Sequence, residues 1–178
     1  IAGRWPLSGA TDGAGQDARF SSPAGIATDG QGNVYVAESS SGRVRKVTPD
    51  GVVSTVASGL GRLTGIASDG TGVLFVTDVG AGVVRRIGRD GVVTAVTGSD
   101  GLLGSGSWPS HGIALDGSNI VVTDPVAGTL WSIAANGVAK SLIGPGSAQG
   151  LVDGDALSAR FAGPSALAVD SSGVVYVA

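Results

Sequence analysis

Residues 20–56 read FSSPAGIATDGQGNVYVAESSSGRVRKVTPDGVVSTV and contain four short strand patterns separated by three turns. The predicted strands are residues 25–28, 34–37, 43–47 and 52–56, which are rich in the β-branched and small residues that suit a pleated sheet. Glycine closes each turn, as in Asp50-Gly51, because it tolerates the backbone geometry of a tight hairpin. The stretch therefore predicts an antiparallel four-stranded meander.

The same four-strand pattern returns along the chain. The first strand recurs at spacings of 40 (25 to 65), 47 (65 to 112) and 54 (112 to 166) residues. The other predicted strands are 74–77, 83–87 and 92–96 in the second repeat, 120–123, 129–133 and 138–142 in the third, and 175–178 in the last. Four antiparallel strands in each repeat of roughly 40–50 residues are typical of a β-propeller blade. No helical period persists over ten residues, so little or no helix is expected.

The repeats resemble the NHL repeat. The motif is carried by PAGIATDGQGNVYVAE at 23–38, GRVRKVTPDG at 42–51 and STVA at 54–57. A connector of related sequence precedes the first repeat and the last: Asp12-Gly13 and Ala18-Arg19-Phe20 are echoed by Asp153-Gly154 and Ala159-Arg160-Phe161. The resemblance implies a propeller that closes with about six blades.

We therefore predict an all-β fold, a single NHL-like propeller over residues 1–178 that forms an incomplete part of a roughly six-bladed ring. The predicted blades are approximately 20–58, 59–98, 99–148 and the incomplete 149–178, with 1–3 as the outer strand of another blade. A small ring, in which the N-terminal strand joins the last blade, is the alternative.

The composition excludes several kinds of site. The chain has 32 Gly, no Cys and 14% charged residues, and its mean hydropathy is +0.32. The absence of Cys excludes disulfides and thiolate metal sites. A net charge of −3 offers no basic face for nucleic acid, and no apolar run is long enough to cross a membrane.

Three long connectors, 3–22, 98–110 and 144–164, are predicted to lie on one face of the propeller, together with the turns between second and third strands. Long loops on a rigid scaffold usually carry recognition, although surface insertions are also tolerated at low cost. We single out Trp5, Trp108 and His111 as candidate contacts on this face. His111 is the only histidine; it suits a general base or one metal ligand, or a polar residue that fills a structural position.

Acidic residues follow the second strand in three repeats. Glu38, Asp78 and Asp124 form either an acidic circle that binds a cation or a basic peptide, or a set of turn caps. Basic residues cluster on the third strands at Arg43, Arg45, Lys46, Arg85, Arg86 and Arg89, and we expect their stems to lie over apolar surface.

No nucleophile elbow, zinc-protease helix or Walker loop occurs in the sequence. We therefore predict a non-enzymatic binding or scaffolding module for a protein, peptide or glycan, without catalytic residues, metal or cofactor. One alternative is a propeller lyase or hydrolase, with a metal or acid/base site at the channel mouth completed by further blades. Another is a structural subunit that self-associates through open strand edges. The low lysine content and the absence of Cys favour an exported bacterial protein, extracellular or periplasmic.

Overall fold

A computed structural model of the chain describes residues 3, 8–96, 111–143, 150–156 and 158–178. These residues form fifteen strands, the one-turn 3-10 helix η1 (Gly15–Asp17) and no α-helix. The first part of the chain contains β1 (Gly13–Ala14), β2 (Pro23–Thr28), β3 (Val34–Glu38), β4 (Arg43–Val47), β5 (Val52–Ala57), β6 (Leu63–Ser68), β7 (Leu74–Asp78), β8 (Val83–Ile87) and β9 (Val93–Ala95). The second part contains β10 (Ile113–Asp116), β11 (Asn119–Asp124), β12 (Thr129–Ile133), β13 (Ala139–Ser141), β14 (Leu167–Val169) and β15 (Val175–Val177).

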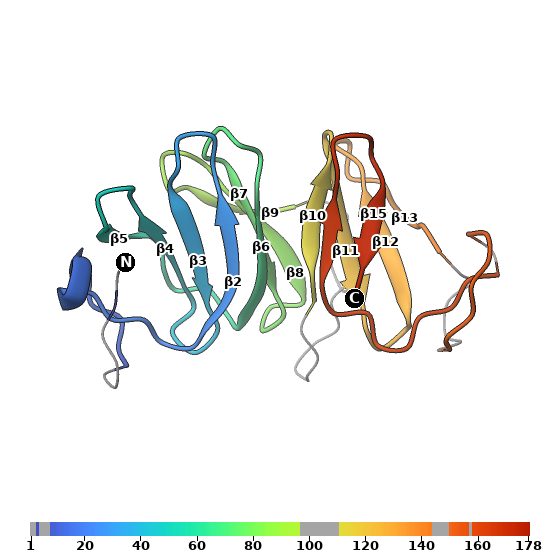
Figure 1. Ribbon diagram of the computed structural model, residues 1–178, viewed down its shortest axis with the longest axis horizontal. Helices are drawn as coiled ribbons and strands as arrows, with labels where there is room; N and C mark the ends of the chain where they lie inside the picture. Colours follow the sequence, from blue (N-terminus) through green and yellow to red (C-terminus); the bar gives the residue numbers. More distant parts are fainter. Residues whose placement is uncertain (1–2, 4–7, 97–110, 144–149, 157) are drawn as a thin grey trace.

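The strands form four separate antiparallel sheets, each a meander of consecutive strands except that β1 adds to the first sheet beside β5. Their orders are β1-β5-β4-β3-β2, β6-β7-β8-β9, β10-β11-β12-β13 and β14-β15. The sheets stand side by side, with the first two in the left half of the view and the last two in the right half (Figure 1). We call them blades one to four. Their first strands are neighbours, since β6 packs against both β2 and β10, and β10 packs against β14. This is the arrangement of propeller blades around an axis.

Blades one and two are joined by an apolar core. Blade one supplies Tyr35, Ala37, Val44 and Ala57, and blade two supplies Leu63, Ile66, Leu74, Val76 and Ile87. The alternation of side chains along each strand explains the arrangement, because every second residue points to the same face of the sheet. Each blade therefore presents one face to the blade before it and the other face to the blade after it.

The same packing joins blades two and three. Ala67 and Val84 of blade two meet Ile113, Ile120, Val122 and Ile133 of blade three. Small residues on the first strands permit this close approach: a Cβ added to Gly65 would come within 2.7 Å of the carbonyl oxygen of His111. The first strands carry glycine and alanine because larger side chains would collide with the neighbouring blade.

The predicted all-β blade architecture is confirmed, and the strand positions agree to within a few residues. The strand β1 was not predicted from the sequence. It comes from the connector before blade one and pairs with β5 as a fifth strand of that sheet. Residues 1 and 2 of the strand predicted at 1–3 lie outside the described residues.

Candidate functional site

The connector before blade one is fixed by a buried arginine. Arg45, on β4, is 0% exposed. Its guanidinium donates to Asp12 at 2.5 Å, to Glu38 at 3.1 Å, and to the carbonyl oxygens of Thr11 and Arg19 at 2.9 Å each. One side chain thus ties the connector to the third strand of the blade. The ring of Phe20 lies beside this guanidinium, 5.4 Å from Arg45 Cζ, within the range of a cation–π contact.

The expectation that the arginine stems lie over apolar surface did not include burial of the charged group, which the structure shows for Arg45. Arg45 pairs in register with Val36 and Thr55, so its side chain lies on the face of the blade that the connector crosses. The connector covers the guanidinium and supplies its hydrogen-bond acceptors. These hydrogen bonds offset the cost of removing the charge from water. Arg85, at the same place in blade two, is partly exposed and has a single ion pair, to Asp78 at 3.3 Å.

Asp12 completes the fixation of the connector. Besides Arg45 it accepts hydrogen bonds from the backbone and the hydroxyl of Thr55, at 3.1 and 3.0 Å. Burial opposes ionisation of Asp12, but the hydrogen bonds from Arg45 and Thr55 outweigh it and keep the pKa below its ordinary value. Asp12 therefore holds β4, β5 and the connector together as an ionised group.

The acidic residues at the ends of the second strands make their hydrogen bonds within the blades. Glu38 is 0% exposed and accepts from the backbone N–H of Ser21 at 2.9 Å and the hydroxyl of Ser41 at 2.5 Å. Asp78, also 0% exposed, accepts from the N–H groups of Gly61 and Ala81.

Asp124 follows the same pattern and accepts from the N–H groups of Val126 and Ala127, at 3.1 and 2.9 Å. The three carboxylates thus occupy one level of the propeller but face turn backbone. No group of three His, Asp or Glu in the described part of the chain is arranged to hold a metal ion.

His111 lies where blades two and three meet, with its side chain 2% exposed. Its backbone is tied to blade two: the N–H donates to Thr64 Oγ1 at 3.2 Å, and the carbonyl oxygen accepts from Thr77 Oγ1 at 3.1 Å. Direct contact between the imidazole and a partner would require movement. Trp5 and Trp108, the other candidate contacts, lie outside the described residues.

The opposite ends of the blades carry a different acidic set, at the turns between first and second strands. Asp29 accepts from Asn33 and from the hydroxyl of Tyr35, and Asp170 accepts from Ser172 and from the hydroxyl of Tyr176. The side-chain hydrogen bond from Asn33 is the main reason that the pKa of Asp29 is lowered to about 2. The bond from Ser172 does the same for Asp170, whose pKa is also about 2.

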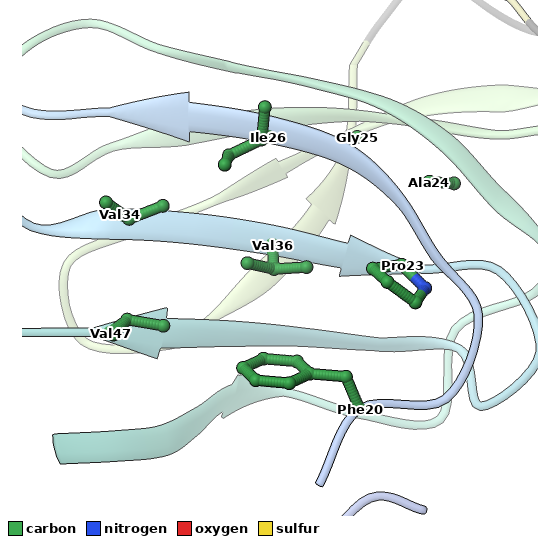
Figure 2. A pocket seen from close by; sticks show the side chains of 8 residues that line it. All are labelled: Phe20, Pro23, Ala24, Gly25, Ile26, Val34, Val36 and Val47. Atoms are coloured by element: carbon green, nitrogen blue, oxygen red, sulfur yellow. The ribbon is translucent and has the colours of Figure 1, made fainter. Parts of the chain in front are cut away.

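An apolar hollow of about 520 Å³ lies on the side of blade one that faces away from blade two. Figure 2 shows its wall, formed by Ile26, Val34, Val36 and Val47 from three neighbouring strands, with the ring of Phe20 at one edge. Ile26 is 70% exposed. Exposed apolar surface of this kind on a soluble protein commonly marks a contact site.

The comparisons with known proteins agree with this geometry. A sequence model described as NHL repeat matches residues 20–47, and the search of curated proteins found no match. Among solved structures, the chain is similar to an auxiliary nutrient binding protein from Bacteroides ovatus, with a TM-score of 0.66 and 15% identity over 90% of this chain and 46% of the other.

It is also similar to virginiamycin B lyase from Staphylococcus aureus, with a TM-score of 0.63 and 15% identity over 94% of this chain and 51% of the other. A third similarity is to a chain of a Nidogen/Laminin complex, with a TM-score of 0.62 and 19% identity over 84% of this chain and 53% of the other. At these identities the likeness concerns the fold alone. The chain spans about half the length of the solved structures that it matches.

Proposed function

Since the chain carries an NHL repeat and folds as part of a β-propeller, we propose that it is a non-enzymatic binding module. It recognises a protein, peptide or glycan with the face that bears its long connectors. The proposal includes Trp5 and Trp108 as contacts and a location outside the cytoplasm. Among the described residues, no helix is long and apolar enough to span a membrane.

The observation that carries the proposal is that the buried Arg45 side chain holds the first connector in place. Arg45 donates hydrogen bonds to Asp12, Glu38 and two connector carbonyls. These bonds hold the connector in one conformation on a rigid blade. A preorganised loop loses little conformational entropy when it binds, which strengthens recognition. The carboxylates of Glu38 and Asp78 serve the same purpose by fixing turns on this face.

The proposal also draws on the relatives of known fold. One is an auxiliary nutrient binding protein, and another belongs to a complex of nidogen and laminin. Binding by these proteins of similar fold supports a recognition role for this chain without identifying its partner.

The test is a binding screen of the purified chain against a glycan array and a phage-displayed peptide library. We expect selective binders whose affinity falls at least tenfold in Trp5→Ala or Trp108→Ala. Val138→Ala serves as the matched control, because Val138 is exposed in the turn between β12 and β13, at the other end of the blade. Binding that is unchanged in both tryptophan variants, or that is lost equally in Val138→Ala, would refute the assignment to the connector face.

A further inference from the structure

A small polar pocket lies where blades one and two meet, at the end of the blades that carries the turns between first and second strands. Its volume is about 270 Å³. The two blades that form it each contain four consecutive strands, β2 to β5 and β6 to β9. The polar side chains that line it are Asp29, Gln31, Tyr35 and Lys46 from blade one, and Thr71 and Arg89 from blade two.

The carboxylate of Asp29 is fully used within the wall of this pocket. Its Oδ1 accepts from the backbone N–H groups of Gln31 and Asn33, at 2.9 and 3.0 Å. Its Oδ2 accepts from the Asn33 side-chain amide at 2.7 Å and from the Tyr35 hydroxyl at 3.0 Å. A carboxylate has about four acceptor positions, so Asp29 has none left for a cation of the pocket.

The two cations of the pocket are its remaining donors. Within the described part of the chain, the half-buried Lys46 side chain makes neither an ion pair nor a hydrogen bond. Arg89 makes no ion pair with a described residue either, and its charge acts on Asp69 from a distance. Burial opposes ionisation of Asp69, but hydrogen bonds from Thr71 and Val73 and the charge of Arg89 keep its pKa below the ordinary value.

The equivalent pocket between blades two and three lacks this pair of cations. It lies at the same place in the repeat, since Phe75 pairs in register with Arg86 as Tyr35 pairs with Lys46. The corresponding lining residues are Phe75 for Tyr35, Arg86 for Lys46 and Ala135 for Arg89. The blade repeat therefore produces the pocket, and the residues particular to blades one and two give it two cations and a phenol.

Size and charge restrict what this pocket can hold. At about 270 Å³ it is smaller than the pockets of drug-sized ligands, which begin at about 300 Å³. Two cations and one carboxylate give the lining a net charge of +1, which matches a single carboxylate better than a dianion such as phosphate. Gly72 leaves the space open, because a Cβ there would stand 3.7 Å from the Tyr35 hydroxyl and 3.8 Å from Arg89 Cγ.

We propose that this pocket binds a small hydroxycarboxylate, the chemistry of a sugar acid. Its carboxylate lies between Lys46 and Arg89, where the hydrogen bonds are charge-assisted. Its hydroxyl groups face the polar side chains of Gln31 and Thr71. The site does not depend on the proposed recognition by the connector face, because it lies at the other end of the blades.

The test is an NMR titration that follows the backbone amide signals of the purified chain as sodium glucuronate is added to about 50 mM, well above the expected dissociation constant of about 1 mM. We expect saturable shifts at Gln31, Thr71 and Gly72. Glucose, which has the same ring without the carboxylate, should bind at least about tenfold more weakly. Lys46→Met and Arg89→Met, which keep an apolar stem, should each weaken glucuronate binding by a similar factor.

Arg86→Met and Lys140→Met are the matched controls, because each also removes one positive charge. Arg86 lines the pocket between blades two and three, and Lys140 lies on β13, so both variants should bind glucuronate like the unmodified chain. Weakening in these controls equal to that in Lys46→Met would overturn the proposal, since it would reduce the effect to net charge.

Two further results would also overturn the proposal: no shift at the three amides in the unmodified chain, or tighter binding of inorganic phosphate than of glucuronate. Neither result bears on the connector face. The methyl glycoside of glucuronate distinguishes two sources of the ligand. Affinity equal to that of the free acid supports the terminal sugar of a glycan, and loss of binding supports a free acid.

Discussion

Replacing Arg45 by Ala should strongly destabilise the protein. The substitution removes a cation that is 0% exposed and leaves Glu38, also 0% exposed, without its counter-ion. Breaking a buried ion pair by removing one partner costs about 3–5 kcal/mol, because the remaining charge stays in a poorly solvated place. Glu38 retains hydrogen bonds from Ser21 and Ser41, which places the expected loss near the lower end, about 3 kcal/mol.

Arg85→Ala is the matched control, at the same position in blade two. The Arg85 side chain is 29% exposed and its one ion pair, to Asp78, is 3.3 Å long. Asp78 is itself buried but keeps the hydrogen bonds from the N–H groups of Gly61 and Ala81, so the loss in Arg85→Ala should be smaller than in Arg45→Ala, about 1–2 kcal/mol. The double variant Arg45→Met/Glu38→Gln should be more stable than Arg45→Ala, because it leaves no uncompensated charge in the interior.

Urea denaturation followed by tryptophan fluorescence measures the free energies of unfolding, and limited trypsin digestion reports on the connector. In Arg45→Ala, cleavage after Arg19 should become faster, because Arg19 contributes a carbonyl oxygen to the guanidinium. Equal destabilisation of Arg45→Ala and Arg85→Ala, with no change in cleavage after Arg19, would refute the view that Arg45 fixes the connector.

Three further predictions concern the turns and the blade interface. Thr77→Val removes the hydroxyl that bonds both the N–H of Gly65 and the carbonyl of His111. It should lower the free energy of unfolding in urea by about 1–3 kcal/mol. The exposed control Thr94→Val should change it by less than about 0.5 kcal/mol. Gly42→Ala should cost well over about 1 kcal/mol, because φ is +60° and the new Cβ would collide with the Leu60 carbonyl. Gly51→Ala, with φ of +85° and no atom within 4 Å of the new Cβ, should cost only about 1 kcal/mol, and equal losses would contradict the collision. The pKa of Asp29 is lowered to about 2 in the folded protein, against about 3.9 in an unfolded chain, so its stabilisation is fully present above pH 4 and is lost as the pH falls through 2. Thermal melts should therefore show that Asp29→Asn lowers the midpoint at pH 5 more than at pH 2, and a constant difference would count against the role of Asp29.

The repeated blade could be predicted from the sequence because its signals are local. Each turn has Gly or Asp at a reversal, and each strand has a short run of β-formers between turns, as in residues 34–37. The first-strand glycines also repeat at recognisable spacings. These features specify a strand meander before any long-range contact is known.

The site could be predicted less well, because it depends on contacts between distant residues. Arg45 resembles the other third-strand arginines in sequence, and only its contacts with Asp12 and Arg19, 33 and 26 positions earlier, separate it from Arg85. One signal was present: Arg45 stands where the alternation requires an apolar residue, and the equivalent residue of the third repeat is Trp131. The exposure of Ile26 could not be read from its motif either, since the motif is the same where Ile66 is buried.

The most direct test of the blade packing compares Ile66→Ala with Ile26→Ala in urea unfolding at a concentration low enough for the chain to be monomeric. The two residues occupy the same position in consecutive blades, but Ile66 is 5% exposed and Ile26 is 70% exposed. We predict a loss of about 2–5 kcal/mol for Ile66→Ala. For Ile26→Ala we predict about 1 kcal/mol or less, in proportion to the smaller area that it buries. Equal losses for the two variants would contradict the account, because they would mean that Ile26 is as fully covered as Ile66.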